Sequence, residues 1–198
     1  MRIPFWLMLL GVSWEASAEA SASKMIYGLH EQVYIEELGV TVPAKLDTGA
    51  DSASLSARYI KTFTRDGQQM VEFDLAIDRD DREELGITQS QWDDIELPLA
   101  GHVRIKQRAE SLEGDEREYR SRPVVLLTVC MGKRQQQIEV NLTDRSEFSY
   151  PMLMGSHALQ KLAAVVDPSS QHIGGSPKCE SPANDVNHVE MTEAAEAQ

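Results

Sequence analysis

The residues best suited to chemistry form one short run, Asp47-Thr48-Gly49-Ala50-Asp51. A carboxylate placed in a turn can act as a general base and activate a water molecule. Glycine gives such a turn the backbone freedom that it needs. Aspartate and glycine are common in turns of every kind, so the triplet alone is a weak signal. Its meaning depends on the elements around it.

The segment before this run predicts a strand that ends at Asp47. Residues 40–46 alternate between apolar and polar side chains, and residues 32–35 form a similar run before a turn at residues 36–39. Two such runs joined by a short turn that contains a glycine predict a β-hairpin. We therefore expect the second strand of a hairpin to deliver the turn that carries Asp47.

The rest of the chain predicts a mainly β domain with one short helix, of a size that suits a small closed barrel. Alternating or apolar runs predict strands at residues 69–77, 97–105, 119–131, 137–142, 150–155 and 163–167, and a helix at residues 156–162. The densely charged residues 78–94 predict a solvated loop with a helical turn. We expect the domain to span residues 25–173. The polar composition of residues 174–198 predicts a disordered acidic tail.

Residues 1–22 have the pattern of a cleavable secretory signal. A basic start is followed by an apolar run too short to span a bilayer and then by Ala-x-Ala patterns. An uncleaved anchor is the alternative. We expect export to the periplasm, with no membrane contact after cleavage. The net charge of −13 argues against nucleic-acid binding, because an acidic surface repels phosphate backbones.

The run at residues 45–55 resembles the active-site turn of retropepsin-type aspartic proteases. Residues 152–159, in which apolar side chains run into Gly155 and then a helix, resemble the second signature of these enzymes. The resemblance covers about residues 25–170. More narrowly, this span is similar to a bacterial family labelled ATP-dependent zinc proteases and now treated as retropepsin-like. It implies the acid-protease fold, a closed β-barrel, and aspartic endopeptidase activity on a protein or peptide substrate.

The resemblance also implies a homodimer, since each chain carries a single Asp-Thr-Gly. Peptide hydrolysis of this kind needs two carboxylates that share one proton, and one turn per chain supplies half of that site. Asp47 would be the catalytic carboxylate. Thr48 would brace the two turns across the dimer axis, and Gly49 would permit the close approach of the partner loop. Ala50 and Asp51 would border the substrate strand.

Two features depart from the family pattern. Many retropepsins place an arginine after the glycine of the second signature, where it pairs with the aspartate that closes the first. Here Ser156 and His157 follow Gly155, so that Asp51 needs another partner, either His157 or an arginine elsewhere. A glycine-rich flap is also missing, and the nearest glycine is Gly101. Coverage of the substrate must therefore differ, or come from the charged insertion.

Other chemistries have less support. The five histidines are scattered with no His-Glu-x-x-His pair, and the chain has neither a glycine-rich ATP loop nor a serine in a nucleophile elbow. We therefore expect no metal and no cofactor. A zinc-dependent peptidase is the less favoured alternative, beside a catalytically silent module that binds an extended peptide by strand addition. Cys130 and Cys179 pair in an oxidising compartment or stay separate, and the sequence leaves both open.

Overall fold

The computed structural model describes residues 23–106 and 119–179. The predicted signal peptide, residues 107–118 and residues 180–198 of the predicted tail lie outside the described residues. Within the described ranges, no helix combines the length and the apolar character that crossing a membrane requires.

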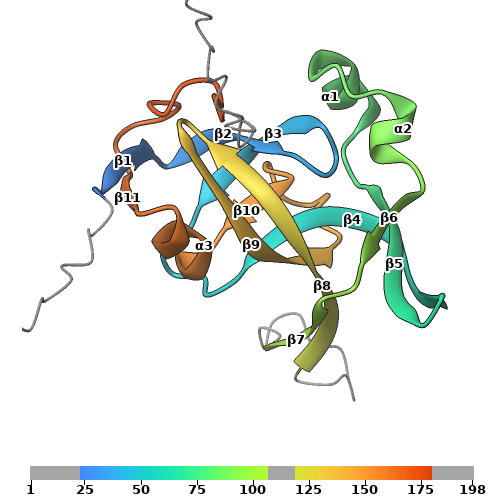
Figure 1. Ribbon diagram of the computed structural model, residues 1–198. Coiled ribbons are helices and arrows are strands. Elements are labelled where there is room, and N and C mark those ends of the chain that lie inside the picture. Colours follow the sequence, from blue (N-terminus) through green and yellow to red (C-terminus); the bar gives the residue numbers. More distant parts are fainter. Residues whose placement is uncertain (1–22, 107–118, 180–198) are drawn as a thin grey trace, which may run out of the picture.

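Strands make up most of the described chain (Figure 1). Their bounds are β1 (Met25–Gly28), β2 (His30–Ile35), β3 (Val40–Leu46), β4 (Ala53–Arg65), β5 (Gln68–Leu75), β6 (Ile95–Pro98), β7 (Gly101–Lys106), β8 (Tyr119–Met131), β9 (Arg134–Thr143), β10 (Met152–Met154) and β11 (Ala164–Asp167). The helices are short: α1 (Arg79–Glu84), α2 (Gln89–Trp92) and α3 (Ser156–Lys161). The architecture is mainly β, as predicted.

Six of the described strands close into a ring. The order β10-β3-β2-β8-β9-β4 returns to β10, because β10 pairs in parallel with β3 and antiparallel with β4. Alternation along these strands turns one row of apolar side chains inward, and the buried core includes Val33, Val42, Leu127, Val140 and Met154. The ring confirms the predicted closed barrel. It also brings the end of β3, where Asp47 follows, against β10 and β4.

Some elements differ from the expectation. The sequence does not predict β4, because residues 53–57 are all buried and the strand therefore lacks the alternation of a half-buried strand. The strand predicted at residues 97–105 is divided into two. β6 pairs with β5 whereas β7 pairs with β8, so the chain changes its partner strand between β6 and β7. The charged insertion contains α1 and α2. Its Gln91 side chain donates to the Gly39 carbonyl in the β2–β3 turn, at 2.7 Å.

The chain packs against the barrel beyond residue 173. β1 and β11 form a parallel two-stranded sheet, and the residues after β11 hydrogen-bond to the connection between β1 and β2. The buried carboxylate of Glu31 accepts the N–H groups of Gly28 (2.6 Å) and Gly174 (3.2 Å). A disulfide joins Cys130 to Cys179. The pairing that the sequence left open is thus formed, and the packed segment reaches Cys179 instead of ending at the predicted boundary.

Candidate active site

The turn after β3 holds Asp47 by its main chain and by its side chain. The Asp47 N–H donates to the Met154 carbonyl on β10 (2.9 Å), and the Ala50 N–H donates to the Asp47 carbonyl (3.3 Å). The carboxylate oxygen Oδ1 accepts the Gly49 N–H at 3.0 Å. The second oxygen, Oδ2, makes no hydrogen bond within the described residues. The carboxylate is therefore fixed at the tip of the turn, beside the exposed Thr48 and Gly49, with one oxygen available for chemistry.

The residues after β10 lock this turn. The N–H groups of Ser156 and His157 donate to the carbonyls of Ala50 (2.7 Å) and Asp51 (3.1 Å). Gly155 lies between them and β10, and a Cβ at Gly155 would stand 2.9 Å from the Ala50 carbonyl oxygen. The two signatures that the sequence singled out, about a hundred residues apart, are therefore in direct main-chain contact.

Asp51 lacks the side-chain partner that its family position leads one to expect. Its carboxylate is exposed and enters no ion pair with a described residue. His157 supports it only through its backbone N–H, and no arginine of the described chain pairs with it. The turn is thus braced by main-chain hydrogen bonds, and the Asp51 side chain faces solvent at its rim.

The tip of the turn is open. A Cβ at Gly49 would meet only Asp47 Oδ1, at 3.4 Å, which is ordinary van der Waals contact. The φ of Gly49 also lies outside the left-handed region. Nothing in the described part of its own chain requires a glycine at this position. The exposed surface of Thr48 and Gly49 leaves room for another chain segment.

A group of buried polar residues lies behind the turn and is not predicted from the sequence. Asn141 on β9 is buried, and its Nδ2 donates to the Ala53 carbonyl (2.5 Å) and to Ser52 Oγ (3.2 Å). Its Oδ1 accepts from Arg122 Nη1 on β8 (3.1 Å). Burial, and secondarily the charge of Arg120, lower the pKa of Arg122. An asparagine among the apolar residues of β9 is the one signal that could have pointed to this network.

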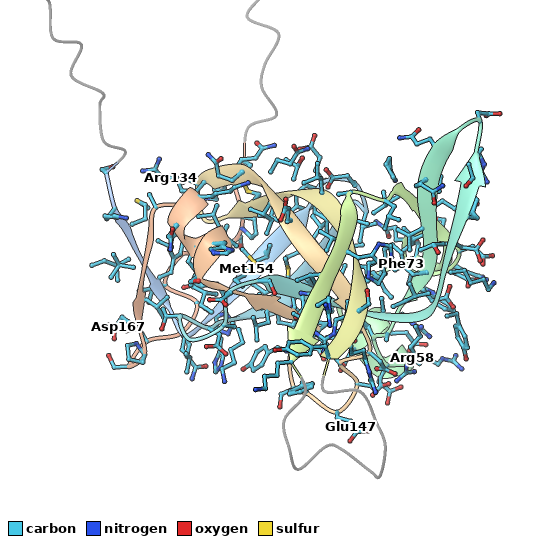
Figure 2. All side chains as sticks on the ribbon, turned by 90° about the horizontal axis from the view of Figure 1, so that it is seen from below. Arg58, Phe73, Arg134, Glu147, Met154 and Asp167 are labelled. Atoms are coloured by element: carbon cyan, nitrogen blue, oxygen red, sulfur yellow. A yellow bond between two sulfur atoms is a disulfide. The ribbon has the colours of Figure 1, made fainter. Side chains whose placement is uncertain are left out.

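A cavity of about 550 Å³ opens beside the network, lined by β4, by β8, and by the end of β9 with Asp144 after it. Three arginines line it, Arg58, Arg120 and Arg122, and Figure 2 shows Arg58 on the opposite side of the molecule from Arg134. Tyr59 also lines it, is 75% exposed and has a φ of 53°, at the irregularity where the β4–β5 register shifts. Bulges and left-handed non-glycine residues often lie at functional sites. The cavity is the candidate substrate groove.

One group of side chains in the described ranges has the spacing of metal ligands. The carboxylate oxygens of Asp74, Asp93 and Asp94 lie within 4.8 Å of one another. Three carboxylates suit a hard cation such as calcium, whereas zinc sites are built from histidine and cysteine as well. None of the three belongs to the Asp47 turn, so this group does not support a zinc peptidase centred on that turn.

Comparison with known proteins agrees with this geometry. Residues 26–177 match the family model described as "RimB-like: Retropepsin-like aspartic endopeptidase RimB". Two curated relatives, each named "Probable alpha-L-glutamate ligase", come from Shewanella pealeana (29% identical over 157 residues) and Desulfotalea psychrophila (29% over 150 residues). The matches cover 75% of this chain but only 30% and 29% of those proteins, so the chain spans less than a third of their length.

A solved structure extends the comparison to the fold. A Legionella pneumophila protein with unknown function (DUF785) superposes with a TM-score of 0.57 at 31% identity, over 77% of this chain and 99% of that one. The family match, the barrel and the Asp47 turn point the same way. The chain belongs to the RimB-like family of retropepsin-like aspartic endopeptidases.

Proposed function

We propose that the protein is an exported aspartic endopeptidase in which two copies of the chain each contribute Asp47 to one active site. The observation that carries the proposal is the form of the Asp47 turn. Its carboxylate has one oxygen fixed by the Gly49 N–H and one oxygen free, at an exposed tip. Such a half-site needs a second carboxylate with which to share a proton.

The chemistry follows from that pair. Two carboxylates a few ångströms apart hold one proton between them, because like charges disfavour double ionisation. The ionised Asp47 would take a proton from water as the water attacks the peptide carbonyl carbon, while the partner's Asp47 would donate its proton to the carbonyl oxygen. The tetrahedral intermediate would then collapse as a proton passes to the amide nitrogen and the C–N bond breaks.

The neighbouring residues would support this pair. Thr48 would hydrogen-bond across the dimer axis and brace the two turns, and the open space at Gly49 would accept the partner loop. Ala50 and Asp51 would border the substrate strand. The main-chain bonds from Ser156 and His157 support this role, because they hold the rim of the turn in place without using its side chains.

Two features support export to the periplasm. The first is the signal pattern of residues 1–22. The second is the disulfide between Cys130 and Cys179, since disulfides persist in oxidising compartments and are rare in the bacterial cytosol.

Dilution of the processed protein tests the paired site. We expect it to cleave an unfolded protein substrate, with a specific activity that falls once the protein is diluted below its dimer dissociation constant, because half-sites are inactive. Sedimentation at the same concentrations measures the dimer directly, and a metal chelator should leave the rate unchanged. A specific activity independent of dilution in a protein that sediments as a monomer would contradict the proposal. Binding of a peptide without any cleavage would favour the silent module.

The groove supports an acidic substrate segment. In a chain with a net charge of −13, Arg58, Arg120 and Arg122 are concentrated around one cavity. Arg58 is paired with Asp144 at 3.3 Å, whereas Arg120 and Arg122 have no carboxylate partner among the described residues. Opposite charge attracts and orients a partner. The glutamate in the names of the curated relatives agrees with a substrate rich in carboxylates.

Matched peptides test this preference. We expect a higher kcat/KM for a glutamate-rich peptide than for its glutamine counterpart. Arg120→Gln should lower kcat/KM for the acidic peptide about 3-fold, since an exposed charge pair contributes roughly 0.2–1 kcal/mol. It should leave the neutral peptide unchanged. Arg79→Gln, on the exposed side of α1, is the matched control. Equal kcat/KM for the two peptides with the unmodified protein would refute the acidic preference.

A further inference from the structure

Arg145 is a buried arginine that is bound to the strand leaving the catalytic turn. It follows β9 and is only 7% exposed. Its Nη1 donates to Ser54 Oγ and its backbone N–H donates to Ser56 Oγ, both at 3.1 Å. Both serines are buried on β4, the strand that begins two residues after Asp51. The guanidinium is therefore hydrogen-bonded to β4, the strand that follows the catalytic turn.

The same residue reaches the segment that enters β10. Arg145 Nε donates to the Tyr150 carbonyl at 3.4 Å, and the Ser56 N–H donates to the Pro151 carbonyl at 2.7 Å. β10 pairs with β4 and supplies the Met154 carbonyl that accepts the Asp47 N–H. Arg145 thus joins β4, which follows the Asp47 turn, to the segment that enters β10, whose Met154 carbonyl holds the turn.

The charge of Arg145 has no carboxylate partner among the described residues, and its guanidinium lies over the Phe148 ring, 4.7 Å from the ring centroid. All its hydrogen bonds go to neutral oxygens. An unpaired buried charge is costly, and structures retain one where it has a task. Burial, and then the charge of Arg122, lower the pKa of Arg145, whereas the charge of Asp47 acts in the opposite direction.

We propose that Arg145 is a positioning residue of the active site, which ties β4 to the segment that enters β10 and so holds in place the two strands that support the Asp47 turn. The inference rests on the proposed function, because it concerns the same pair of carboxylates. It also gives a reason for the buried cation. Many retropepsins have an arginine directly after the glycine of the second signature, and this chain has Ser156 at that position.

Several charged or titratable groups surround Arg145. Arg122 faces it from β8, and Asp78 and Asp81 line the same cavity of about 50 Å³ from the side of α1. His30 of β2 stacks on the Tyr150 ring with centroids 4.3 Å apart. All of them stay in place when Arg145 alone is replaced. A difference in kcat between the variants therefore reports the loss of the Arg145 side chain.

The test is kcat and KM, measured separately for the full processed protein with one neutral peptide, at a temperature where each variant is folded. Arg145→Gln cannot bond both the Ser54 hydroxyl and the Tyr150 carbonyl as the guanidinium does, so kcat should fall about 100-fold with KM little changed. Arg145→Lys keeps the charge but not the planar fork. It should lower kcat about 10-fold, again with KM little changed. Arg79→Gln, 82% exposed, should match the unmodified protein.

Each outcome decides the proposal. An unchanged kcat for folded Arg145→Gln, or a raised KM with an unchanged kcat, would show that Arg145 does not position the turn and would overturn it. If Arg145→Gln does not fold, as judged by thermal melting, Arg145→Lys decides: an unchanged kcat, or a raised KM with an unchanged kcat, overturns the positioning role. Cleavage that survives Asp47→Asn would instead defeat the proposed function, whatever the Arg145 variants do.

Discussion

Replacement of Asp47 by asparagine is expected to lower kcat for peptide cleavage by at least about 1,000-fold, within the range that general acid–base catalysis contributes. Asparagine has nearly the shape of aspartate, and its Oδ1 can still accept the Gly49 N–H that holds the side chain. The amide cannot take a proton from water or share one with a second carboxylate. In a homodimer the substitution removes both halves of the pair. The measurement is kcat for a quenched peptide, with the melting temperature as a check on the fold.

Asp66→Asn is the matched control for this substitution. Asp66 is exposed at the tip of the β4–β5 hairpin and has a φ of 50°, which asparagine tolerates as well as aspartate. Its replacement should leave kcat unchanged. Persistent cleavage by Asp47→Asn would exclude the aspartic mechanism. If that cleavage also disappeared with a chelator, the metal-dependent alternative would gain support.

The barrel could be predicted because its strands carry local signals. Residues 40–46 alternate cleanly since one face of β3 is buried and the other is not, and the same holds for β5. Residues 137–140 of β9 also alternate, whereas Val140, Asn141 and Leu142 are all buried. β4 lacks that signal. Its first five residues are buried on both faces, between the barrel interior and the network behind the turn, and Ser54 and Ser56 are buried polar residues that resemble surface positions in a sequence.

The site could be predicted only where its residues are contiguous. The Asp47 turn and the Gly155 signature are short runs with their own patterns, and the structure brings them together. Asn141, Arg122 and Arg145 are isolated polar residues, 75 to 98 positions after Asp47. Only the closure of the barrel, with β9 parallel to β4, brings Asn141 against Ser52, just before β4, and Arg145 against Ser54. No local pattern encodes that contact.

Gly155→Ala is expected to lower the free energy of unfolding by at least about 3 kcal/mol, at the upper end of what overpacking costs. The backbone at Gly155 has φ −82° and ψ 175°, which any residue adopts, so that the requirement for glycine is spatial. A Cβ would stand 2.5 Å from the Ser52 carbonyl oxygen and 2.9 Å from that of Ala50. Both obstacles are backbone atoms of the catalytic turn, which cannot rotate away as a side chain would.

The melting temperature separates this clash from the general effect of adding a methyl group. For a domain of this size, 3 kcal/mol corresponds to a fall of at least about 6 °C. At Gly101, where a Cβ would meet no atom within 4 Å and φ is not positive, alanine should change stability by less than about 0.5 kcal/mol. Gly155→Ala should also lose activity at temperatures where it remains folded, because a turn displaced by an ångström can cost about 100-fold in rate. A Gly155→Ala protein as stable and active as Gly101→Ala would show that the second signature does not hold the catalytic turn.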